Sequence, residues 1–120
     1  MADYEDLAQR YIDTWNETDA LARRAAVDQL YSEQARYVDP MGVAEGRDAI
    51  VQMIGAVQQQ FPGLTFTLAG PVDGHHDQFR FRWELGPGSG EAPIVGFDVA
   101  TTDDTGRIDR VLGFLDKVPA

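Results

Sequence analysis

Apolar residues recur three or four positions apart in three segments of the first half of the chain, which is the pattern of amphipathic helices. The first helix is predicted over residues 4–15. Thr18 or Asp19 can cap a second helix that runs to about residue 30. A third begins at residues 46–48 and ends before Pro62. The predicted buried faces carry Leu7, Tyr11, Trp15, Val27, Leu30, Ile50, Ile54 and Val57.

After residue 63 the apolar residues alternate with polar ones, which indicates strands. Segments rich in Gly, Pro and Asp separate the alternating stretches and read as turns. The predicted strands are residues 64–69, 79–85, 93–102 and 108–118, with an earlier short strand at residues 35–38 that Pro40 stops.

This order of elements predicts an α+β fold in a single domain over residues 1–120. Three helices would cover one face of a strongly bent, mixed and mostly antiparallel sheet. Such a sheet leaves an internal cavity at its open end, which is a usual place for a ligand.

The chain is strongly acidic, with 20 acidic residues against 10 basic ones and a net charge of −10. Lys117 is the single lysine and the arginines are scattered, so the basic cluster that nucleic-acid binding requires is missing. The electrostatic field of this negative charge repels anions, so a neutral, apolar small molecule is a more suitable ligand than an anion. The sequence has no cysteine and no apolar run long enough to span a membrane. Its acidic first residues differ from a signal peptide, which predicts a cytoplasmic protein.

Asp98 is unusual because aspartate is depleted in strands, yet it lies in the middle of one. Alternation places it on the same face as Ile94, Gly96 and Ala100. If that face is buried, the carboxyl group loses hydration and its pKa rises, so that it can donate a hydrogen bond. If the face is wet, Asp98 is merely solvated.

Asp39 and Tyr11 each admit two interpretations. Asp39 precedes a proline at a strand end and can simply start a turn, or it can move a proton at the rim of the cavity. Tyr11 can be a core residue whose hydroxyl bonds the backbone, or a donor to an oxyanion in the cavity.

His75 and His76 are adjacent in the sequence and lie between Asp73 and Asp77. Adjacent side chains in a strand-like register point apart, which favours a solvated turn over a metal site. We expect no metal and no cofactor. The aromatic residues Trp15, Phe66, Phe81 and Trp83 are expected in the core or along the cavity.

Three segments in this order are similar to one known family: Gln9-Arg10-Tyr11, Tyr37-Val38-Asp39-Pro40-Met41-Gly42, and Pro93 through Asp98 to Gly106-Arg107-Ile108. Over nearly its whole length the chain resembles the ketosteroid isomerases and, more broadly, the cone-shaped NTF2-like superfamily with its SnoaL-like polyketide cyclases. The start of the third helix, Gly46-Arg47-Asp48, is also typical of that superfamily.

The resemblance implies an enzyme that abstracts a proton beside a carbonyl and returns it at another carbon. Asp39 would be the general base, and Tyr11 and a protonated Asp98 would bind the dienolate oxygen, because in that family a carboxylic acid in an apolar site is kept neutral. The expected substrate-binding residues are Trp15, Phe81, Trp83, Val111 and Leu115.

The chain departs from the steroid enzymes between Tyr11 and Asp39, where it is longer by about one helical turn. Gly113 stands where related epoxide hydrolases carry a carboxylate, which disfavours epoxide opening. Two other functions stay open: a non-catalytic small-molecule carrier, and a protein-interaction module. For the second, an outward strand face could pair two copies in a homodimer; its residues are Val95, Phe97, Val99 and Thr101.

Overall fold

The computed structural model describes residues 3–119 and contains three helices and seven strands in that range. The helices are α1 (Tyr4–Asn16), α2 (Ala20–Leu30) and α3 (Arg47–Gln60). The strands are β1 (Tyr31–Asp39), β2 (Gly42–Glu45), β3 (Thr65–Leu68), β4 (Asp73–His75), β5 (Gln78–Gly86), β6 (Ile94–Thr102) and β7 (Ile108–Lys117).

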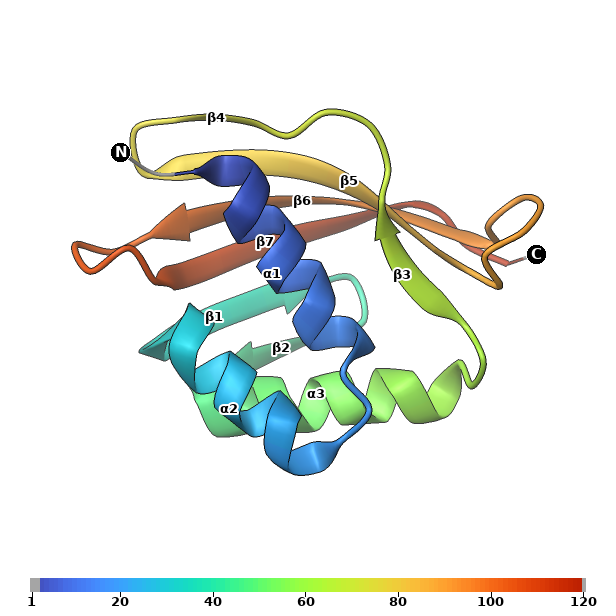
Figure 1. Cartoon of the computed structure of the whole chain (residues 1–120), viewed down its shortest axis with the longest axis horizontal. Coiled ribbons are helices and arrows are strands. Elements are labelled where there is room, and N and C mark those ends of the chain that lie inside the picture. Colours follow the sequence, from blue (N-terminus) through green and yellow to red (C-terminus); the bar gives the residue numbers. More distant parts are fainter. Residues whose placement is uncertain (1–2, 120) are drawn as a thin grey trace.

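The strands form one sheet in the order β2-β1-β7-β6-β5-β3, with β4 paired to β5. All neighbours are antiparallel except β1 and β7, which run parallel. In Figure 1, α1 crosses the strands diagonally, while α2 and α3 lie beside each other below it. The predicted α+β class is therefore confirmed: three helices pack on a mixed, mostly antiparallel and open sheet.

Two short strands, β2 and β4, were not predicted, and β1 begins at Tyr31 rather than at residue 35. A strand of three or four residues has too few alternating positions to show a period. The short strand β2 pairs with β1 across the Pro40 turn, and β4 pairs with β5. Both pairings depend on contacts between strands, which the pattern along one strand does not show. Tyr31 starts β1 directly after α2, and its strand partner is Ile108 of β7.

Local chemistry explains where the helices begin. The Asp3 carboxylate accepts from the Asp6 N–H, and Asp19 caps α2 by accepting from Ala22. Gly46 has a φ of +87°, which favours glycine, and its N–H donates to the Ala35 carbonyl. Within the described chain, the helices fall short of the length and hydropathy that a membrane crossing needs.

Arg47 ties α3 to an irregular part of β1. The β1–β7 register shifts between Tyr31 and Arg36, so not every carbonyl in this part of β1 accepts a hydrogen bond from the neighbouring strand. The guanidinium of Arg47 donates from Nε and Nη2 to the Tyr31 carbonyl, at 3.0 and 2.8 Å. A charged donor with two bonds to one acceptor is a strong hydrogen-bond arrangement.

Replacing Arg47 with alanine is expected to lower the free energy of unfolding by about 2 kcal/mol, because the Tyr31 carbonyl loses a charged donor. Urea unfolding measures the change. Arg36→Ala is the matched control, since Arg36 is exposed on the same strand, and its effect should stay within about 0.5 kcal/mol. Equal losses in the two variants would contradict this role of Arg47.

Candidate functional site

Two carboxylates, Asp98 on β6 and Asp39 on β1, lie on the two sides of β7, with a glycine of β7 between them. Asp98 of β6 pairs with Gly113 of β7, and Val38, just before Asp39, pairs with Leu112. A Cβ on Gly113 would lie 2.9 Å from Asp98 Oδ1 and 3.1 Å from the Asp39 Cβ. The missing side chain of Gly113 therefore makes the space in which the two aspartates lie close together.

Asp98 is buried and bonded to Tyr11. Its side chain is 1% exposed, and the Tyr11 hydroxyl donates to Oδ2 at 2.8 Å. Burial raises the pKa of Asp98 to about 7, and the Asp39 charge adds to the rise, while polar contacts with Tyr11 and Trp83 offset part of it. Burial, and then the Asp98 charge, also raise the pKa of Tyr11. The carboxyl group therefore keeps its proton far above the usual range of an aspartate.

Asp39 is half-buried and held by three donors. The Tyr37 hydroxyl donates to Oδ2 at 2.5 Å, and the Met41 and Gly42 N–H groups donate to Oδ1 at 2.8 and 3.1 Å. The two backbone bonds are those of an aspartate that starts a turn, which is one of the two interpretations of its place in the sequence. A carboxylate has about four acceptor positions, so one position of Asp39 is left for a ligand.

Tyr37 is the site residue that the sequence analysis missed. It is 3% exposed, and burial, followed by the neighbouring Asp98 and Asp39 charges, raises its pKa well above the ordinary value. Its position two residues before Asp39 on the same strand was the available signal, because residues two apart on a strand share a face. The site therefore holds two tyrosine–aspartate pairs, one on each side of Gly113.

A pocket of about 700 Å³ opens over this part of the sheet. Tyr11, Tyr37 and Asp39 line it, whereas Asp98, which is bonded to Tyr11, does not. The rings of Trp15, Phe66 and Trp83 form one wall, with Phe66 5.5 Å from Trp15 and 5.2 Å from Trp83. The pocket is thus mostly apolar, with hydroxyl and carboxylate groups gathered at one side.

The expected substrate-binding residues divide into two groups. Trp15, Trp83 and Leu115 line the pocket. Phe81 and Val111 are each 1% exposed and lie in the core instead. Phe81 pairs with Asp98 and packs edge-on against the Tyr11 ring at 5.1 Å, so helix α1 covers it. Trp83, two residues further along β5, lies over Gly96, where a Cβ would meet its ring.

His75 is the last residue of β4 and His76 begins the β4–β5 turn; both are exposed, and neither lines the pocket. Their Nδ1 atoms are 3.0 Å apart. Between residues 3 and 119, no group of three or more His, Cys, Asp or Glu side chains gathers in a way that could hold a metal ion.

Replacing Gly113 with alanine is expected to lower the free energy of unfolding by about 1–3 kcal/mol, because the new methyl group would overlap the buried Asp98 carboxyl. Denaturant unfolding measures it. Gly55→Ala is the control: its Cβ would meet only the flexible end of Arg23, and alanine favours the α3 helix. A Gly113→Ala protein as stable as the wild type would show that the carboxylates are not packed this closely.

An open mixed sheet with three helices on one face defines the NTF2-like class of α+β folds. An NTF2-like protein of unknown function from Cytophaga hutchinsonii has this fold; it is 14% identical over 97% of this chain and 92% of that chain, with a TM-score of 0.68.

The chain belongs to the SnoaL-like family, because the family model of the SnoaL-like domain matches residues 8–111. A crystal structure from Agrobacterium tumefaciens str. C58 is 45% identical over 97% of this chain and 99% of that chain, with a TM-score of 0.91. That protein is described as a suggested isomerase of the SnoaL-like family. A suggested polyketide cyclase from Sinorhizobium meliloti shares the fold at 17% identity over 90% of this chain and 93% of that chain, with a TM-score of 0.68. A comparison with curated proteins found no match.

Proposed function

We propose that this protein is an acid–base enzyme, an isomerase or cyclase that moves a proton beside the carbonyl of a neutral, apolar small molecule. The observation that carries the proposal is the buried Tyr11–Asp98 pair at an apolar pocket with Asp39 next to it, across Gly113. The suggested isomerase activity of the Agrobacterium relative agrees with it.

In this proposal Asp39 is the general base. It takes a proton from the carbon beside the carbonyl, and the electron pair of that C–H bond moves to make an enolate oxygen. Tyr11, which lines the pocket, donates a hydrogen bond to that oxygen. The enolate then collapses and Asp39 returns the proton, at the same carbon or at a conjugated one.

Asp98 acts through Tyr11, because it does not line the pocket. When Asp98 is protonated, its O–H can donate to the phenolic oxygen, and the Tyr11 hydrogen is free for the ligand. When Asp98 is ionised, Tyr11 donates to it, as in the 2.8 Å bond. In the proposed reaction Asp98 is therefore a positioning residue rather than a direct donor.

A second candidate is a small-molecule carrier with no turnover. The three hydrogen bonds to Asp39 favour it, because they use most of the acceptor capacity of the proposed base. The same pocket and the same neutral ligand belong to both candidates, so binding alone does not separate them.

The experiment is proton exchange in D₂O, followed by NMR, with neutral cyclic enones and β,γ-unsaturated ketones. The enzyme proposal predicts that the wild type incorporates deuterium beside the carbonyl and that Tyr11→Phe is slower by about 10²–10³. Binding without exchange supports the carrier. A protein that neither binds nor exchanges any of these ketones contradicts both candidates.

We also propose that two copies pair through the outer apolar patch: Val43, Phe97, Val99, Leu112 and Phe114. Leu112 and Phe114 are 39% and 55% exposed and lie beside Val99 and Phe97 on β6. Apolar side chains that adjoin on an open sheet face are typical of an interface. Val95, which was also expected on this outward face, is buried and does not belong to the patch.

Light scattering is expected to give twice the chain mass for the wild type and the mass of one chain for Phe114→Arg. Leu21→Arg is the control, because Leu21 is 83% exposed on α2, away from the sheet. A monomeric wild type would contradict the homodimer.

A further inference from the structure

A second, smaller hollow of about 300 Å³ adjoins the main pocket where the ends of α1 and α3 approach β3. The two hollows have five lining residues in common: Trp15, Val57, Phe61, Phe66 and Leu85. Because these five side chains line both hollows, a single layer of side chains separates the two spaces.

The frame of the smaller hollow is held by hydrogen bonds between elements. The Asn16 side-chain amide bonds both the N–H and the carbonyl of Phe66, each at 2.8 Å. The Gln58 amide donates to the carbonyls of Trp15 and Glu17, at 2.9 and 2.8 Å. These bonds fix the end of α1 to β3 and to α3, so the hollow keeps its shape without a ligand.

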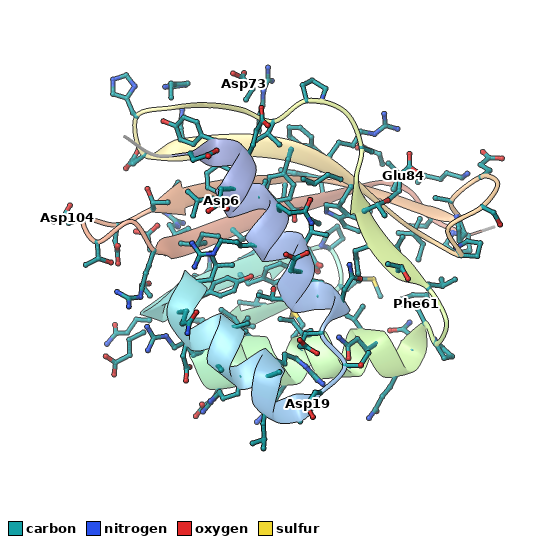
Figure 2. The ribbon with its side chains drawn as sticks, in the orientation of Figure 1. Asp6, Asp19, Phe61, Asp73, Glu84 and Asp104 are labelled. Carbon is teal, nitrogen blue, oxygen red and sulfur yellow. The ribbon has the colours of Figure 1, made fainter. Side chains whose placement is uncertain are left out.

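Phe61 is the shared residue best placed to move. Trp15, Phe66 and Leu85 are buried in the core, and Val57 is held within α3. Phe61 is half-buried and follows the last residue of α3, and Figure 2 shows it where the chain leaves that helix for β3. Phe61 packs only against the edge of the core, so a change of its rotamer disturbs less packing than a movement of Trp15, Phe66 or Leu85 would.

We propose that the two hollows form one bipartite site for an elongated neutral molecule, with its carbonyl end at Tyr11 and its apolar tail passing Phe61 into the smaller hollow. The inference rests on the proposed function, whose ligand it defines further. Among the described residues that line the two hollows, Asp39 is the one with a charged side chain. Nothing in the lining therefore pairs with an anionic tail, whereas each methylene that leaves water strengthens binding about fourfold.

Calorimetry with 4-methylphenol and 4-hexylphenol tests the proposal, because the two probes share a hydroxyl head and differ in tail length. Thr65→Trp fills the smaller hollow, which Thr65 lines, without touching the main pocket. It is expected to weaken the hexyl probe at least tenfold and to leave the methyl probe unchanged. Thr67→Trp is the matched control, exposed on the same strand and face but outside both hollows, and should change neither probe.

Phe61→Ala opens the partition at this one residue and should raise the hexyl-to-methyl ratio of affinities. This second variant keeps the test decisive if the tryptophan variant folds poorly. The inference is overturned if the methyl probe binds and the ratio is unchanged in Thr65→Trp and in Phe61→Ala. That result leaves the proposed function standing. If neither probe binds the wild type, the proposed function fails, and the bipartite site fails with it.

Discussion

Asp98→Asn is expected to be more stable than the wild type by about 2–4 kcal/mol at pH 8 and equally stable near pH 4. The folded protein holds the Asp98 proton up to a pKa of about 7, whereas the ordinary pKa of a free aspartate is 3.8. Between these values the folded state binds more protons than the unfolded state does. The free energy of unfolding therefore falls as the pH rises from about 4 to about 7, by up to about 4 kcal/mol. Asparagine cannot ionise, so the variant escapes this loss.

Urea unfolding of both proteins from pH 4 to pH 8 measures the difference. Asp104→Asn is the control, since Asp104 is exposed in the β6–β7 turn, as Figure 2 shows. Its stability difference from the wild type should stay small across the range. A wild type that gains stability relative to Asp98→Asn as the pH rises would mean that Asp98 is stabilised in its charged form, against the burial argument.

Asp39→Asn is expected to slow deuterium exchange into a bound ketone by about 10²–10⁴, the usual contribution of a general base. Asparagine has the same shape. Its side-chain oxygen can still accept from the turn N–H groups and its NH₂ group can donate to the Tyr37 oxygen, but it cannot take a proton. Binding of the ketone should change little. The exchange rate and the dissociation constant, both measured by NMR, separate these two effects.

Tyr37→Phe is the companion variant. It removes one of the three donors to Asp39, so exchange should persist or become faster while the Asp39→Asn protein stays slow. If the two variants lose exchange equally, the Asp39 carboxylate does not act as a base without the Tyr37 hydroxyl. If Asp39→Asn exchanges at the wild-type rate, Asp39 is not the base.

The helices were predictable because each has at least two turns of regular apolar spacing and a local start signal, such as Asp19 or Gly46. The burial of Asp98 was left open at the sequence level, because alternation shows which residues share its face but not whether helices cover that face. The covering residue is Tyr11, 87 positions away in the chain. Only the packing of α1 on the sheet decides whether the Asp98 carboxyl group is buried or solvated.

The candidate site was predicted in part for the same reason. Tyr11, Asp39 and Asp98 carried local signals, whereas the gap at Gly113 depends on the register of three strands. Phe81 and Trp83 share a face of β5 and look alike in sequence, yet α1 covers the first and leaves the second at the pocket. The pattern of residues along one strand does not show where a helix packs above that strand.

The protonation of Asp98 is the central claim, because it is what turns the Tyr11–Asp98 pair into a donor to a ligand. Carbon-13 NMR of protein labelled at the aspartate carboxyl groups measures it directly, with Asp98→Asn to assign the signal. The signal missing from that variant is predicted to titrate with a pKa near 7, the value that burial gives this carboxyl group. Titration of the Asp98 signal below pH 5 would show that the carboxyl is charged in the folded protein at neutral pH, which would contradict the account.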